Sequence, residues 1–191
     1  MNTRASLIVV TGFLLMLSLP QATSAFQGRD HFTPQEVDLI KDTQILDKRI
    51  EVFIRAADRR VLVLTGTAAG DAKQLKKDAE KWGELPAGNP GELISDIARI
   101  FDEAITNIDD VSARDEKNPL IPKALRRLAA AASRIVDQVK PLSTRSSSPT
   151  EASSFDQLME NADSIVQAAG KLPPEVAKKG KSKEEKPRTT N

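Results

Sequence analysis

Apolar residues recur at spacings of three and four along most of the chain, the pattern of helices that bury one face. The first such segment opens with Thr33-Pro34-Gln35-Glu36, in which threonine caps, proline suits the first turn and glutamate can reach back to the cap. Neither glycine nor proline then occurs before Gly66. The pattern therefore predicts one continuous helix of 32 residues, about 48 Å long.

Two further helices are predicted in the middle of the chain. A short one covers Asp71 to Trp82, with Trp82 on its apolar face. Residues 89–92 then repeat the helix-start signal, and the long apolar stripe after them predicts a helix buried centrally in the fold. The stripe consists of Leu93, Ile94, Ile97, Ile100, Phe101, Ala104, Ile105, Ile108 and Val111.

The next helix is predicted from Ile121 to Pro141, which stops it. The alanines at 129–132 give this helix a narrow waist, where a neighbouring helix can approach closely. Residues 142–152 are dominated by serine, threonine and proline, so we expect a flexible linker there.

A last helix is expected from Ser154, with Gln157 as capping partner, to a stop at Gly170. Residues 171–191 carry seven basic side chains against three glutamates and almost no apolar ones, which predicts a disordered basic tail. Residues 26–170 then form one all-α domain. The matched apolar faces predict an antiparallel bundle of four main helices plus one short helix.

Residues 1–25 have the three parts of a secretory signal peptide. Arg4 supplies positive charge, residues 7–19 form an apolar run, and small residues lead to a cleavage point between Ala25 and Phe26. A helix of that run spans about 20 Å, less than the ~30 Å hydrocarbon core of a membrane. We expect export to a periplasm or out of the cell, with no transmembrane segment after removal of the signal; its retention as an anchor is the alternative.

Composition excludes several classes of chemistry. The chain has no cysteine, which removes disulfides, thiolate metal sites, cysteine nucleophiles and the lipid-modified cysteine of a lipoprotein. Its 28 basic and 27 acidic residues balance, no basic stripe is present, and one tryptophan and no tyrosine are available for base stacking. A nucleic-acid partner is therefore not predicted.

Val61, Leu62, Val63 and Leu64 form an apolar run before a glycine-containing turn, as at the start of a nucleotide-binding fold. The glycines follow a G-x-x-x-G order, which matches neither phosphate-binding motif. We interpret the run as a helix end that is apolar on all sides. It is either buried or presented as an interaction surface.

His31 is the only histidine of the chain and is expected to be solvated near a helix start. The tandem arginines Arg59-Arg60 and Arg126-Arg127 are interpreted as solvated or as binders of an external anion. The carboxylates of the central helix fall between its apolar positions, on the predicted solvated face, and no acid–base or metal role is assigned to them: Asp96, Asp102, Glu103, Asp109 and Asp110.

The segment Phe32-Thr33-Pro34-Gln35-Glu36 resembles the Leu-Thr-x-x-Gln element of the small periplasmic helical chaperones related to Spy. Phenylalanine replaces leucine, and glutamine stands one position early. The resemblance covers these five residues and implies a chaperone function as one alternative.

The sequence predicts no catalytic residue and no cofactor. The leading hypothesis is a non-enzymatic exported bundle that binds another protein or an envelope component through its surface. Besides the chaperone, the alternative is a small-molecule or anion binder that uses a polar groove between helices, lined by Asp102, Asp109, Arg126 or Arg127. The partner and the oligomeric state stay open.

Overall fold

The computed structural model describes residues 29–67, 72–144 and 148–174, and all regular structure within them is helical. The predicted signal peptide with its cleavage point at Ala25 and Phe26, and most of the predicted tail, lie outside these residues. The helices are α1 (Pro34–Asp42), α2 (Leu46–Thr65), α3 (Ala72–Trp82), α4 (Pro90–Arg114), α5 (Leu120–Ser143) and α6 (Pro149–Gly170). None of these helices is long and apolar enough to cross a membrane.

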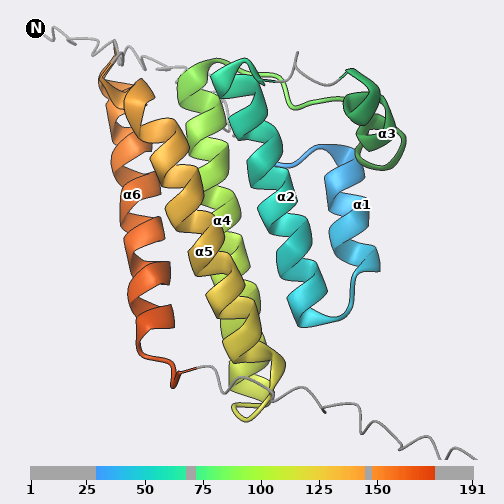
Figure 1. Ribbon diagram of the computed structural model, residues 1–191, viewed down its shortest axis with the longest axis vertical. Helices are drawn as coiled ribbons and strands as arrows, with labels where there is room; N and C mark the ends of the chain where they lie inside the picture. Colours follow the sequence, from blue (N-terminus) through green and yellow to red (C-terminus); the bar gives the residue numbers. More distant parts are fainter. Residues whose placement is uncertain (1–28, 68–71, 145–147, 175–191) are drawn as a thin grey trace, which may run out of the picture.

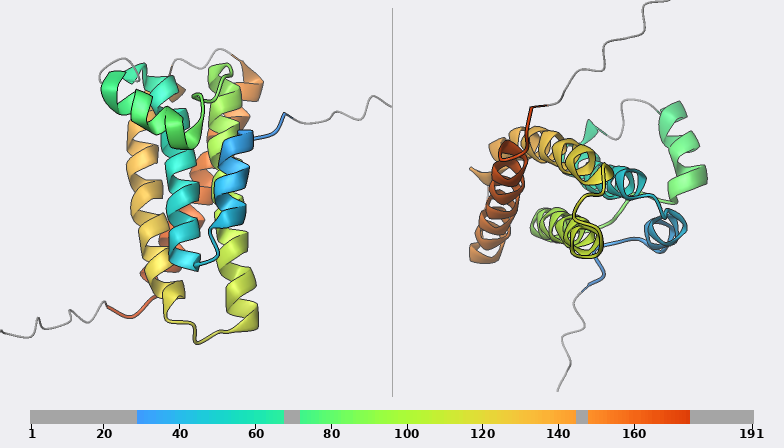
Figure 2. Two further views of the ribbon diagram at one scale, coloured as in Figure 1. Left: turned by 90° about the vertical axis from the view of Figure 1, so that its right-hand side faces the viewer. Right: turned by 90° about the horizontal axis from the view of Figure 1, so that it is seen from below.

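The predicted all-α bundle is confirmed, with α2, α4, α5 and α6 as its four main helices (Figure 1). Consecutive bundle helices run in opposite directions, but their neighbours in space are not always consecutive in sequence. α2 packs against α4 and α5, and α6 packs against the same two helices (Figure 2). Because the connection from α4 to α5 crosses the bundle diagonal, α2 and α5 lie side by side and run in the same direction.

The prediction of one continuous helix from Pro34 to Thr65 is wrong. The chain leaves helical geometry at Thr43 (φ −93°, ψ 100°) and at Ile45 (φ −81°, ψ 124°), and α1 folds back beside α2 (Figure 1). This reversal brings Glu36 against α2, where it bonds with Arg60. In an unbroken helix those two residues, 24 positions apart, would be separated by about 36 Å. A tertiary contact therefore decides the break.

The starts of α1, α4 and α6 follow local capping chemistry, and two predicted helix ends are corrected. The predicted capping boxes of α1 and α4 are both present. The last helix starts at Pro149 instead of Ser154, because the hydroxyl of Ser148 accepts the backbone amide of Glu151 at 3.2 Å. The prediction that Pro141 stops its helix is wrong, because α5 continues to Ser143. The predicted linker, residues 142–152, therefore contains the end of α5 and the start of α6, and residues 145–147 lie outside the described residues.

The core fills the space between the four main helices with aliphatic side chains, phenylalanines and alanines. The predicted alanine waist of α5 is part of it, with Ala132 fully buried. On α6, the side-chain amide of Asn161 donates to the carbonyl of Ala98 on α4 at 2.8 Å, which fixes one helix against the other. The fully buried core side chains include Ile50, Phe53, Ile94, Ile97, Phe101, Ala104, Leu128, Ile135 and Leu158.

Candidate functional site

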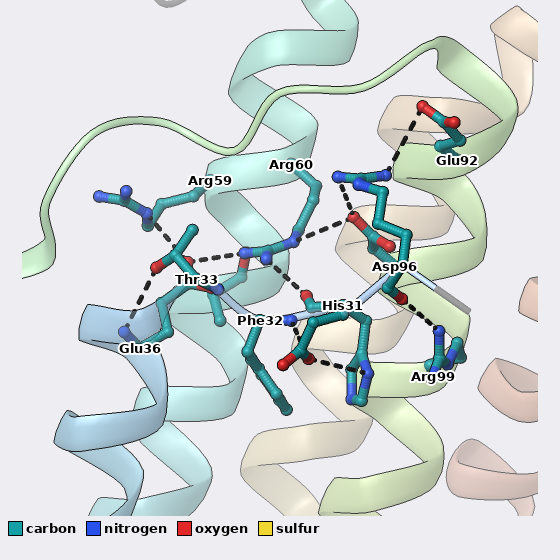
Figure 3. A network of polar contacts seen from close by, with 12 residues as sticks. His31, Phe32, Thr33, Glu36, Arg59, Arg60, Glu92, Asp96 and Arg99 are labelled. Atoms are coloured by element: carbon teal, nitrogen blue, oxygen red, sulfur yellow. Dashed lines mark hydrogen bonds and ion pairs between the residues drawn. The ribbon is translucent and has the colours of Figure 1, made fainter. Parts of the chain in front are cut away.

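The most deeply buried charges in the described part of the chain belong to Glu36, Arg59 and Arg60, which are 0%, 2% and 1% exposed. The Oε1 atom of Glu36 accepts hydrogen bonds from Arg59 Nε at 3.1 Å and from Arg60 Nη1 at 2.6 Å (Figure 3). Its Oε2 atom accepts the backbone amide of Thr33 at 3.0 Å. The tandem arginines of α2, predicted to be solvated or to bind an external anion, therefore bind a carboxylate of the same chain.

Arg60 extends this network to α4. Its guanidinium donates to the carbonyl of His31 at 2.6 Å, and its Nε lies 3.9 Å from Asp96 Oδ2. Asp96 is only 3% exposed and accepts a hydrogen bond from Arg29 Nη2 at 2.9 Å. The prediction that Asp96 lies on the solvated face is wrong, because the segment before α1 crosses α4 at this point and covers it.

Burial shifts the pKa of two groups in the network. It raises the pKa of Asp96 above the ordinary value for an aspartate, although the neighbouring charges of Arg29 and Arg60 favour the ionised form. Burial also lowers the pKa of Arg59, against the attraction of Glu36. Each charged group here has exchanged water for a partner in the chain, so removing one partner leaves the other buried and uncompensated.

His31 is half-buried, which corrects the prediction of a solvated histidine. Its Nε2 lies 2.9 Å from Glu103 Oε2 on α4, and its ring packs on Phe32 with the centroids 4.4 Å apart. Its Nδ1 is buried without a hydrogen-bond partner, 3.9 Å from the carboxylate of Asp30. The local sequence could not predict this pairing, since 72 positions separate His31 from Glu103.

Together these contacts hold residues 29–33 between α2 and α4. Phe32 is 7% exposed and packs on the fully buried Phe53, with ring centroids 5.8 Å apart. Arg99 of α4 donates to the carbonyl of Arg29 at 3.0 Å (Figure 3). The groups of the network bond mainly with one another and with the backbone, which is the arrangement of a structural clamp.

A second set of charges lies where α2 and α5 run side by side. Three ion pairs join the helices, and in each the partners are 76 positions apart: Asp47 with Lys123, Glu51 with Arg127, and Asp58 with Arg134. The acids on α2 and the bases on α5 share the same spacing of four and seven residues. Since the helices run in the same direction, equal steps along both keep every pair in register. We call this set the charge ladder.

The first pair of the charge ladder gives a test of pH dependence. Asp47 is 3% exposed, and the hydrogen bond from Lys123 lowers its pKa below the ordinary 3.8. A carboxylate whose pKa is lower in the folded chain than in the unfolded chain stabilises the fold at pH values above its unfolded-state pKa. This stabilisation disappears as the pH falls through the folded-state pKa. We expect Lys123→Met to lower the free energy of unfolding at pH 7 and to have a smaller effect below pH 3.8.

Urea titrations followed by circular dichroism, one at pH 7 and one below pH 3.8, would measure this difference. Lys140→Met, at an exposed position of the same helix, is the control. A Lys123→Met effect that is equal at both pH values would contradict the assignment of the lowered pKa to this pair.

Two pairs of the charge ladder line an open groove of about 460 Å³ between α2 and α5. Its charged lining residues, which we call its walls, are Glu51, Arg55 and Asp58 on α2 and Arg127 and Arg134 on α5. The other lining residues, Ile54, Ala130 and Ala131, are apolar, and we call them its floor. Small side chains on the floor let another segment approach the helix backbones closely. The full lining is Glu51, Ile54, Arg55, Asp58, Arg127, Ala130, Ala131 and Arg134. We call this surface the α2–α5 groove.

The residues predicted for an anion site do not come together. Arg127 lines the α2–α5 groove, whereas Arg126 donates to the carbonyl of Pro173 after α6. Asp102 and Asp109 are exposed on α4, as predicted for a solvated face, and do not line this groove.

Of the apolar run at the end of α2, Val61 belongs to the core and Leu64 packs against it. Val61 is 5% exposed, and Leu62, Val63 and Leu64 are half-buried. Trp82 is 8% exposed, as predicted for a core residue, and Arg59 lies over its ring at 5.9 Å from the centroid.

Comparison with known proteins identifies no relative: no family model, no curated protein and no solved structure matches this chain.

Proposed function

We propose that this chain is an exported, non-enzymatic protein that binds an amphipathic helix of a partner protein in the α2–α5 groove. The observation that carries the proposal is the lining of that groove: an alanine-containing floor beside a wall on α2 with two acids and one arginine and a wall on α5 with two arginines. Helix-in-groove binding uses such a surface, because small floor residues admit the partner's backbone and the walls select its charged edges. The export part rests on the sequence of residues 1–25.

The charges of the groove favour a helix over a small anion. Arg127 and Arg134 already bond with carboxylates of the charge ladder, and Arg55 bonds with Asp78 on α3. A free anion would have to compete with all three carboxylates. A helix with one acidic and one basic edge can instead place its acids beside α5 and its bases beside α2, so that the internal pairs become larger networks.

The test places a photo-cross-linking amino acid at Ala130, which is exposed at the centre of the groove. The matched control carries it at Thr106, exposed on α4, which lies diagonally opposite α5 in the bundle. We expect irradiation of the producing cells to yield a discrete cross-linked protein from Ala130 and none from Thr106. Equal products from both positions would contradict a specific groove.

A defined probe tests the chemistry of the occupant. The probe is a labelled synthetic helix with an alanine stripe between a glutamate edge and a lysine edge, titrated against the purified protein by fluorescence anisotropy. Ala130→Trp fills the floor and should weaken binding at least tenfold, while a helix with lysine on both edges should bind weakly. Unchanged binding to the Ala130→Trp variant would exclude the groove as the site.

A further inference from the structure

The turn that reverses the chain between α1 and α2 contains neither glycine nor proline. Thr43, Gln44 and Ile45 are all compatible with a helix, and within the described residues only glycines have positive φ. Ile45 is a poor first residue for α2: its side chain makes no capping bond, and it is 58% exposed, the most exposed of the large apolar side chains described. Within the turn, Arg49 donates to the carbonyl of Thr43 at 2.7 Å and Gln44 donates to the carbonyl of Lys41 at 2.6 Å. Helix propensity favours continuing the helix, so the turn depends mainly on contacts elsewhere.

Those contacts come from few residues. Among the described elements, α1 packs only on α2 and α3, outside the four-helix bundle (Figure 2). The only buried residue of α1 is Glu36, bonded to Arg59 and Arg60 of α2. Residues 29–33 add the contacts of Arg29 with Asp96 and of His31 with Glu103. All of these contacts would be the same if α1 came from another copy of the chain.

We propose that two copies of this chain exchange residues 29–42 reciprocally and form a dimer. In each copy, the turn at residues 43–45 becomes helical and joins α1 to α2 as one helix over residues 34–65. The Glu36 of one copy then binds Arg59 and Arg60 of the other. A short hinge favours such exchange, because the exchanged dimer recovers the contacts of residues 29–42 with α2, α3 and α4 and adds the helical bonds of the hinge. It gives up the hydrogen bond from Arg49 to the carbonyl of Thr43.

The geometry of the monomer suits this dimer. Because α1 and α2 are antiparallel, the two joined helices lie antiparallel about a two-fold axis, as a reciprocal exchange requires. α4 and α5 extend past the α1–α2 turn in both side views (Figures 1 and 2). The extension of α2 would run along these ends, where the apolar side chains of Val111, Leu120 and Ile121 are only half-buried.

The first experiment changes the hinge and measures the molar mass by size-exclusion chromatography with light scattering. Thr43→Ala, Gln44→Ala and Ile45→Ala combined strengthen the helix and should raise the dimerisation constant by roughly tenfold per chain. Inserting Gly-Gly-Ser after Gln44 relaxes the turn and should leave only monomer. The proposal would be overturned by a dimer that forms equally in both hinge variants, or by a monomer for both variants at all concentrations.

The second experiment mixes two complementary variants. One carries Glu36→Arg, and the other carries Arg59→Glu with Arg60→Glu, so that each has like charges facing one another in its own closed form. Only the exchanged heterodimer pairs opposite charges at both sites. We expect the variants to form a one-to-one dimer when refolded together. Two outcomes would exclude exchange through this contact. In the first, both variants fold as separate monomers. In the second, each variant is unfolded alone and the mixture is unfolded as well.

Discussion

Replacing Glu36 by glutamine is expected to lower the free energy of unfolding by about 3–5 kcal/mol, because two guanidinium groups would lose their buried counter-charge. Glu36 is 0% exposed, and both of its partners, Arg59 and Arg60, are at most 2% exposed. Neither arginine can recover its hydration without opening the contact between α1 and α2. Urea denaturation followed by circular dichroism measures the loss.

The matched control is Glu92→Gln in α4. Glu92 occupies the same capping-box position as Glu36, but its side chain is 47% exposed and its ion pair with Arg29 spans 3.7 Å. This change should cost no more than about 1 kcal/mol, the scale of a cap or a surface pair. Similar losses for the two variants would show that the buried pairing of Glu36 contributes little beyond helix capping.

Truncating Phe53 to alanine should have an effect of comparable size, about 3–5 kcal/mol, because the lost ring leaves a cavity in a closely packed interior. Phe53 is fully buried on α2 and also supports Phe32 of the segment before α1. The loss should therefore appear in the urea transition seen by circular dichroism and in the fluorescence of Trp82. Trp82 is the only tryptophan of the chain, and it reports on α3, which packs against α1.

Val166→Ala serves as the control for Phe53→Ala. Val166 is 41% exposed on α6, and its truncation should change stability by no more than about 0.5 kcal/mol. A loss at Phe53 as small as that at Val166 would contradict a tightly packed core at this point of the bundle.

The helical class and most helix ends were predictable because they depend on neighbours within one turn. The capping boxes that begin with Thr33 and Asn89 use only residues three positions apart. The apolar stripe of α4 likewise identifies its buried face, of which Ile97 and Phe101 are fully buried members. Ser154 was the wrong start for α6 because Ser148 offers equivalent capping chemistry six positions earlier.

The charge ladder was missed although the sequence contains its signal. Asp47, Glu51 and Asp58 have the same spacing as Lys123, Arg127 and Arg134. That signal becomes useful only when α2 and α5 are compared as neighbours running in the same direction. The predicted antiparallel bundle did not specify which helices are neighbours, so it gave no reason to compare these two.

The sequence by itself determined the helical class, the apolar faces and the capping boxes of α1 and α4, since each of these follows from contacts between residues close along the chain. Only the tertiary structure decided which charges are buried. Glu36 and Arg60, for example, are 24 positions apart and meet because α1 folds back at Thr43–Ile45. The free energy of that contact outweighs the local preference for one continuous helix. The sequence pattern within a few residues reflects only the local preference, so it could not predict which of the two is larger.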